Sequence, residues 1–260
     1  MATPSTNDSL RSSEYYNWSN SPSKRMFDCA AAALALVILS PLMLLVAIAV
    51  KLTSPGPILF RQTRMGRHGW TFEILKFRSM HMRGDGPAVT RAGDARLTSI
   101  GGFLRRSKLD ELPQLVNVLR GDMSLVGPRP KLPHHQTYTL RVRPGVTGAA
   151  SLAFRDEERF LHHVPEHALD ACQINLLMPL KRELDEEYLA DATFVSDLGV
   201  LCRTVTGKHK VTDVERIGNL QGSLVSLSQA LGQSIAPPPQ PTTTAAHAEP
   251  HLRLRNMAAR

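Results

Sequence analysis

The sequence predicts a mixed α/β protein that is mostly helical, in which a re-entrant membrane helix (helix, break, helix) precedes a small cytosolic domain. Three observations support this. The stretch Cys29–Val50 contains no charged residue and is interrupted by Ser40-Pro41. Two strand-like segments flank a glycine-containing turn, which predicts a short β-hairpin. Further along the chain, apolar residues recur at helical spacing, which predicts surface amphipathic helices.

Composition suits one sizeable core with tails, since 42% of the 260 residues are hydrophobic and 21% are charged. The formal net charge of +8 favours anionic partners: lipid headgroups, nucleotide phosphates or nucleic acid. Charge alone does not choose among them. The sequence has no Gly-rich dinucleotide fingerprint or Walker loop, and its three cysteines lack Cys-x-x-Cys spacing, which disfavours Rossmann, P-loop and zinc proteins.

The apolar stretch Cys29–Val50 would measure about 33 Å as a straight helix, enough to cross a bilayer. Pro41 removes one helical hydrogen bond and crowds the carbonyl of Val37, and the Ser40 hydroxyl is available to bond a freed carbonyl. Basic residues flank both ends, so the positive-inside rule assigns both ends to the cytoplasm. We therefore predict a re-entrant hairpin over residues 24–52. A proline-kinked single span is the alternative.

The hairpin is expected from Ile58–Phe60 and Thr71–Phe77, joined by the turn at Gly66–Gly69. Side chains alternate along a strand, so Lys76 and Arg78 are predicted to project to the same face and to point at one phosphate. The alternative is an exposed basic edge that discourages strand association.

Asp110 and Glu111 lie at a predicted helix start that ends at Gly121. Unpaired backbone N–H groups and the positive end of the helix dipole favour ionised carboxylates there. With an ordinary pKa of about 3.9, an aspartate needs no general base to act as a nucleophile. A neighbouring glutamate suits Mg²⁺, and nearby arginines suit phosphate oxygens. The alternative is a capped surface helix whose carboxylates are solvated or paired with Lys108 and Arg106.

Two later features complete the prediction. The Gly127-Pro128-Arg129-Pro130 turn is rigid because of its prolines, and it presents Arg129 at low entropic cost. Glu183–Leu189 and Asp197–Val205 are expected to be helices. The second helix is predicted to pack on the core, or alternatively to lie on the membrane, through one face. That face consists of Leu198, Leu201, Cys202 and Val205.

An ordered set of motifs then resembles the bacterial sugar transferase family, the small monotopic phosphoglycosyl transferases. The resemblance covers roughly residues 24–207. The motifs are Lys24-Arg25-Met26-Phe27-Asp28, Ser54-Pro55-Gly56-Pro57, Phe60-Arg61-Gln62, Gly66-Arg67, Lys76-Phe77-Arg78-Ser79-Met80, Ser107-x-Leu109-Asp110-Glu111-Leu112-Pro113-Gln114-Leu115, Gly121-Asp122-Met123-Ser124-Leu125-Val126-Gly127-Pro128-Arg129-Pro130 and Arg143-Pro144-Gly145-Val146-Thr147-Gly148.

The resemblance implies transfer of a phospho-sugar from a nucleoside diphosphate sugar, with UDP as the nucleotide, to undecaprenyl phosphate. This would be the first membrane step of exopolysaccharide or glycoconjugate synthesis, on the cytoplasmic face of the bacterial inner membrane. Asp110 would form an aspartyl phospho-sugar intermediate and Glu111 would bind Mg²⁺. Lys76, Arg78, Arg106 and Arg129 would contact substrate phosphates. No nucleic acid partner is implied, and a homodimer is left open.

The domain organisation follows from the same reading. We expect a disordered extension over residues 1–23, the membrane helix over 24–52, the catalytic sugar transferase domain over 53–207 and a flexible tail over 208–260. Residues 148–154 depart from the family pattern, because the usual Gln and Gly after the turn are missing. The donor sugar therefore does not follow from the resemblance.

Two other classes of function remain in view. A non-catalytic membrane-anchored adaptor that binds nucleic acid or anionic lipid would explain the net charge equally well. It does not explain acidic residues among the arginines, where they weaken polyanion binding. A hydrolase that releases free sugar phosphate would use the same pair of carboxylates.

Overall fold

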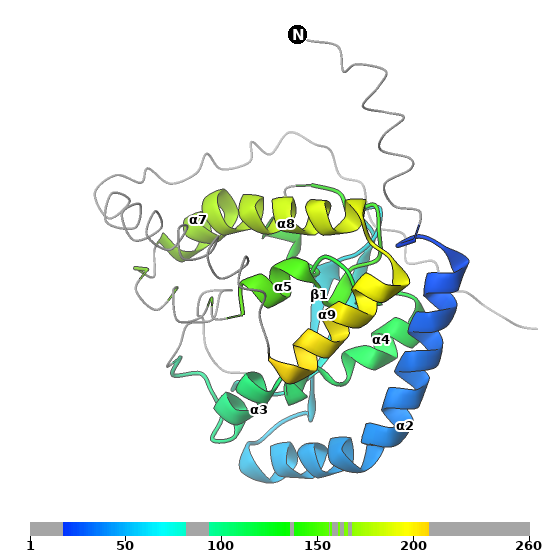
Figure 1. Ribbon diagram of the computed structural model, residues 1–260. Coiled ribbons are helices and arrows are strands. Elements are labelled where there is room, and N and C mark those ends of the chain that lie inside the picture. Colours follow the sequence, from blue (N-terminus) through cyan, green and yellow to red (C-terminus); the bar gives the residue numbers. More distant parts are fainter. Residues whose placement is uncertain are drawn as a thin grey trace, which may run out of the picture.

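The computed structural model describes residues 18–81, 94–135, 138–155, 157, 161, 164–165 and 168–207 (Figure 1). Within these residues the protein is mostly helical, with a small hairpin and one long apolar N-terminal helix, as the sequence predicts. The predicted tail over residues 208–260 lies outside the described residues, and so do residues 1–17 of the predicted N-terminal extension.

The long helix α2 (Pro22–Thr53) contains Pro41. It begins at Ser21, whose hydroxyl accepts a hydrogen bond from the Lys24 N–H at 3.0 Å. The Ser40 hydroxyl donates to the Val37 carbonyl at 2.8 Å, as predicted for the group that the proline frees. Figure 1 shows α2 bending partway along its length, and the internal proline accounts for the bend.

Both limbs of α2 pack on the same body of the protein. Ala32, in the first limb, lies in a cluster with residues of α4 (Gln114–Arg120) and β3 (Ser124–Val126). Val46 and Val50, in the second limb, pack against residues of β2 (Thr71–Phe77) and α3 (Gly101–Ser107). The outward side is apolar and exposed. It carries Met26, Leu34, Val37, Ile38, Leu42, Leu44, Leu45, Ile48 and Leu52.

By length and composition α2 is able to cross a membrane, a property that buried core helices and signal sequences share. Here only 11% of its most apolar window is buried within the protein. The exposed apolar surface therefore suggests a membrane location.

The predicted hairpin is confirmed. Strands β1 (Leu59–Met65) and β2 pair antiparallel, with Leu59 opposite Phe77 and Met65 opposite Thr71. A second, parallel pair was not predicted: β3 lies beside β4 (Gly145–Thr147). These strands have three residues each, too few to show an alternating pattern in the sequence.

The predicted helix start at Asp110 is wrong in detail. Lys108 adopts a left-handed conformation with φ of 60° and ends α3. A short 3-10 helix, η1 (Leu109–Glu111), follows, and α4 begins only at Gln114. The end is as predicted, because Gly121 has a left-handed φ of 93° and caps α4. The remaining helices are η2 (Pro133–His135), α5 (Ala149–Ala153), α7 (Leu169–Cys172), the π-type η4 (Gln173–Leu177), α8 (Met178–Ala190) and α9 (Phe194–Thr206).

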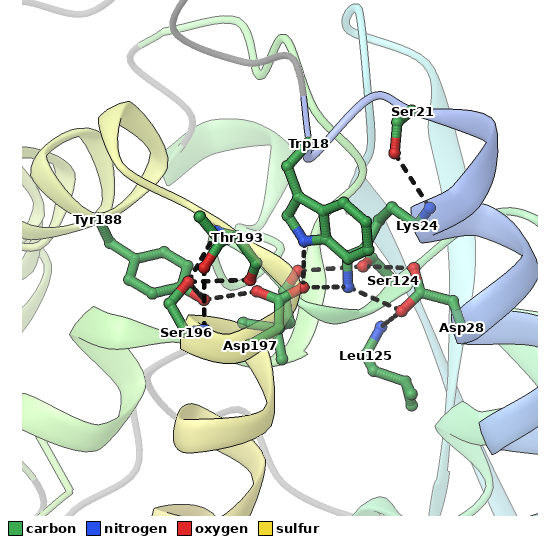
Figure 2. A network of polar contacts seen from close by, with 11 residues as sticks. Trp18, Ser21, Lys24, Asp28, Ser124, Leu125, Tyr188, Thr193, Ser196 and Asp197 are labelled. Carbon is green, nitrogen blue, oxygen red and sulfur yellow. Dashed lines mark hydrogen bonds and ion pairs between the residues drawn. The ribbon is translucent and has the colours of Figure 1, made fainter.

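Helix α9 packs on the core as predicted, but of the predicted face only Leu201 packs there. Val200 is fully buried, whereas Leu198 is 46% exposed and Val205 is 87% exposed. Asp197, on the buried side, has polar partners inside the protein, so a charged residue takes a core position (Figure 2). The buried face of α9 therefore overlaps the predicted face only at Leu201.

Figure 2 shows the buried polar network that fixes the start of α2. The ammonium of Lys24 lies 2.8 Å from Asp28 and 2.8 Å from Asp197. Asp28 accepts a hydrogen bond from the Ser124 hydroxyl at 2.7 Å, and Asp197 accepts one from the Trp18 indole at 2.9 Å. The network thus joins α2 to β3 and α9.

Candidate active site

Three of the predicted site residues lie far apart in the sequence but contact one another in the structure. They are Lys76, Glu111 and Arg129. Lys76 of β2 lies 2.9 Å from Oε1 of Glu111. Arg129 donates from Nη1 to Oε2 at 3.2 Å and from Nη2 to Oε1. Asp110 precedes Glu111 in η1, and both carboxylates are buried, with 3% and 8% exposed. The geometry brings one carboxylate and two cations together, with a second carboxylate beside them.

Asn117 positions Lys76 opposite η1. Its side-chain amide accepts from the Leu75 N–H at 3.0 Å and donates to the Glu73 carbonyl at 2.7 Å. It therefore bonds the edge of β2 that β1 leaves open and ties α4 to that strand. Asn117 is fully buried, so these bonds have no water to replace them.

We expect Asn117→Ala to reduce the free energy of unfolding by about 2 to 3 kcal/mol, because it leaves the buried Leu75 N–H unpaired and removes the bond to the Glu73 carbonyl. Chemical denaturation measures this change. The same truncation at exposed Arg120 is the control and should change the stability by less than about 0.5 kcal/mol. Equal stability of the two variants would contradict the role of Asn117.

Arg129 is held by the close approach of its turn to β4. The Gly127 N–H donates to the Thr147 carbonyl at 2.9 Å, and Arg129 Nη1 also donates to the Val146 carbonyl at 3.2 Å. A Cβ at Gly145 would lie 2.2 Å from the Gly127 nitrogen, so the two segments meet only because residue 145 has no side chain. This contact explains why the two glycine-containing motifs belong to one site.

Charge stabilises the ionised form of Glu111. Burial raises the pKa of Glu111, but the charges of Arg129 and Lys76 outweigh it and place the pKa well below its usual range. Glu111 in turn raises the pKa of Arg129. Burial lowers the pKa of Lys76, with Glu111 opposing the shift.

Asp110 behaves differently. Its Oδ1 is buried and has no hydrogen-bond partner. Burial raises the pKa of Asp110, Lys76 opposes this shift and Glu111 adds to it. The expectation that the helix dipole keeps Asp110 at its ordinary pKa is therefore wrong in direction, because desolvation outweighs the charges around it.

Two predicted phosphate contacts lie elsewhere. Arg78 is 2% exposed, and its guanidinium donates to Ser54 Oγ at 2.7 Å, to the Ser54 carbonyl at 2.6 Å and to the Pro57 carbonyl. It caps the end of α2, so the prediction that Lys76 and Arg78 point at one phosphate is wrong. Arg106 is exposed, and its Nη1 lies near Gly102 on α3.

Sequence reasoning missed Arg64. Burial, then the charge of Arg129, lower the pKa of Arg64 to about 10, while Glu111 opposes the shift. Arg64 pairs with Phe72 in the hairpin register, four positions from the pair that contains Lys76, and therefore shares a face with Lys76. The cross-strand register, which the sequence alone did not give, places Arg64 on this face.

The two carboxylates suit Mg²⁺ in donor chemistry, since this ion binds one or two carboxylates together with substrate phosphates. Asp110 offers an unpartnered oxygen. Both oxygens of Glu111 contact Arg129 or Lys76, so phosphate oxygens would have to take over these cations before Glu111 turns to a metal. The residues fit the ion on that condition.

Comparison with known proteins matches the chain to bacterial sugar transferases. The family model of the bacterial sugar transferases matches residues 19–210. The chain is 53% identical over 141 residues to the UDP-glucose:undecaprenyl-phosphate glucose-1-phosphate transferase of Caulobacter vibrioides, covering 50% of this chain and 53% of the relative. It is 40% identical over 195 residues to the Escherichia coli protein of the same name, covering 70% of this chain and 39% of the relative.

A relative of similar extent is the exopolysaccharide production protein ExoY of Sinorhizobium fredii. It is 35% identical over 207 residues, which cover 70% of this chain and 84% of the relative. The chain spans about half or less of the length of the two glucose-1-phosphate transferases. The match of the family model to most of the chain establishes that the protein belongs to the bacterial sugar transferase family.

Proposed function

We propose that the protein transfers a phospho-sugar from a UDP-sugar to undecaprenyl phosphate, with Asp110 as the covalent nucleophile. The observation that carries the proposal is the buried, unpartnered Oδ1 of Asp110 beside the Glu111 cluster. The names of the relatives support the substrate classes. A non-catalytic adaptor that binds polyanions gives no role to two buried carboxylates beside Lys76 and Arg129, because carboxylates there weaken polyanion binding.

In the first step, Asp110 attacks the phosphorus that bears the sugar, an aspartyl–phosphate bond forms and the bond to the leaving UMP breaks. Lys76 and Arg129 bind the oxygens of the diphosphate and offset the charge that UMP carries away. In the second step, an oxygen of undecaprenyl phosphate attacks the same phosphorus and Asp110 leaves as a carboxylate. The product is undecaprenyl diphosphate sugar. Bound Mg²⁺ at Glu111 would further neutralise the diphosphate.

The test is a transfer assay with the full chain in lipid nanodiscs, using a panel of UDP-sugars and undecaprenyl phosphate. We expect one UMP and one lipid-linked diphosphate sugar for each donor consumed. Turnover of equal rate without the polyprenyl phosphate would instead identify a hydrolase, and no turnover with any donor would refute the proposal.

Removal of divalent metal should abolish this transfer. We expect EDTA to reduce the rate at least about 100-fold, because the negative charge of the diphosphate is no longer neutralised by a divalent cation. Added Mg²⁺ should restore the rate. Unchanged melting of the treated protein is the control, since the described residues hold together through contacts of their own. Full activity in EDTA would remove Mg²⁺ from the proposal.

The pH dependence should report Asp110. Attack needs the ionised carboxylate, and burial raises its pKa, so activity is expected to fall on acidification at a higher pH than an ordinary aspartate would give. Lys76 lowers the pKa of Asp110, hence Lys76→Gln should move the acid limb of kcat/KM to still higher pH. A limb that stays in place in Lys76→Gln would argue against Asp110 as the titrating group.

We further propose that α2 enters one leaflet and returns, with the remaining domain on the cytoplasmic face. The support is that both ends of α2 are anchored in one body: Lys24 pairs with Asp197, and Val50 packs on Phe77. A helix that crossed the bilayer would separate these anchors by the thickness of the membrane.

Cysteine labelling tests the topology. Ser23→Cys and Thr53→Cys place exposed thiols at opposite ends of α2, in a background where Cys29 and Cys172 are replaced by serine. We expect a membrane-impermeant maleimide to label neither new thiol in intact spheroplasts and both after lysis. Exposed Cys202 marks the side of the domain in the same experiment. Labelling of one end alone in intact cells would indicate a spanning helix.

A further inference from the structure

A second buried charged cluster lies next to Arg129. It consists of Lys131, which follows the rigid turn, Lys181 and Asp185 of α8, and Glu157. Lys131 is 7% exposed, Lys181 8% and Asp185 3%. Arg129 acts electrostatically on Lys131, and Glu157 on Arg129, so this cluster adjoins the Glu111 site.

Two members of the cluster have polar atoms without partners. Asp185 Oδ1 accepts from the Ala150 N–H at 3.2 Å, but its buried Oδ2 has no hydrogen-bond partner. Lys181, by contrast, is paired with Glu157. The described residues offer no hydrogen bond or ion pair to Lys131 Nζ, although Asp185 acts on it electrostatically. Asp185 Oδ2 is therefore a buried acceptor without a partner, and Lys131 Nζ is a donor without one among the described residues.

The charge balance indicates which kind of ligand fits. Burial lowers the pKa of Lys131 to about 8 and raises the pKa of Asp185 to about 6, so both remain mainly charged at neutral pH. Together with the Lys181–Glu157 pair the cluster is close to neutral. A neutral cluster attracts a diphosphate only weakly, whereas a hydroxyl group both donates and accepts and so satisfies both unpaired atoms.

The position of the cluster also favours a sugar hydroxyl as its ligand. Arg129 bonds the Val146 carbonyl and Asp185 bonds the Ala150 N–H, four residues further along the same segment. Four residues span at most about 14 Å. The unpaired atoms thus lie near the place where a sugar attached to an Arg129-bound phosphate would reach. Ala150 also belongs to the segment that departs from the family pattern.

We propose that Asp185 and Lys131 bind hydroxyl groups of the donor's sugar ring, with Asp185 Oδ2 accepting and Lys131 Nζ donating, and that they determine which sugar is transferred. This inference rests on the proposed function and deepens it. It concerns the sugar alone, because the diphosphate is bound by the Glu111 site.

Binding of UDP-glucose and of UDP to the full chain in nanodiscs tests the proposal, with Asp110→Asn present throughout so that the donor is not consumed. We expect Asp185→Asn and Lys131→Met each to weaken the binding of UDP-glucose at least about 10-fold. The affinity for UDP should change by less than about 2-fold, because UDP has no sugar. Glu186→Gln, on the exposed side of α8, is the control and should change neither affinity.

Equal weakening of UDP and UDP-glucose would show that these residues bind phosphate or nucleotide, and unchanged affinities would show that they bind nothing; either result overturns the inference. Lys131→Met leaves the Asp185–Ala150 bond intact, so it keeps the test valid if Asp185→Asn fails to fold. Failure of the proposed function is seen separately, as absence of sugar transfer by the unaltered protein.

Discussion

Asp110→Asn is expected to reduce sugar transfer at least about 1,000-fold, because a carboxamide of the same shape is not a competent nucleophile. The structure makes this change conservative in volume. Oδ1 of Asp110 has no partner to lose, and burial already favours its uncharged form. The variant should therefore fold normally, and the loss of transfer rate should come from the chemical step. Steady-state assays of UMP release measure it.

The same variant tests the covalent intermediate directly. Protein incubated with a donor radiolabelled in the sugar, without acceptor lipid, should retain label through denaturation, and Asp110→Asn should retain none. Asp191→Asn makes the same change at an exposed position of the chain and should label normally. Full turnover or full labelling by Asp110→Asn would exclude this residue as the nucleophile.

Lys24→Met is expected to cost about 3 to 5 kcal/mol of stability, because it leaves Asp28 and Asp197 buried without their shared cation. Trp18 is a built-in reporter, since its indole bonds Asp197 and its ring packs edge-on against Phe194 at 5.9 Å. Denaturant unfolding followed by tryptophan fluorescence measures the change.

Two companion variants separate charge from packing. Lys51→Met removes an exposed lysine from the same helix and should change stability by less than about 0.5 kcal/mol. Adding Asp28→Asn and Asp197→Asn to Lys24→Met removes the uncompensated charges and should recover much of the loss. If Lys24→Met were as stable as the unaltered protein, the network would not anchor α2.

Several features were predictable because they depend on residues within one turn of chain. The Ser40–Val37 bond at the break in α2, the hairpin turn after Met65 and the left-handed cap at Gly121 are all local. The Asp-Glu pair and its flanking motifs carried the family resemblance, which the family model confirms. Local backbone chemistry and motif order therefore sufficed for these features.

The destinations of the basic residues were not predictable. Lys76 and Arg78 have the same charge and similar neighbours, yet Lys76 pairs with Glu111 and Arg78 caps α2. Alternation assigns a face to each residue only while the strand continues, and β2 ends at Phe77. The packing of α2 against the hairpin decides what lies next to Arg78.

By itself the sequence determined the family, the bend in α2, the hairpin and the carboxylate pair, because each is encoded by neighbouring residues. Only the tertiary structure decided the raised pKa of Asp110, the buried face of α9 and the meeting of Lys131 with Asp185. The physical reason is that desolvation and Coulomb interaction depend on which distant segments exclude water from a group, and residue spacing along the chain does not specify that.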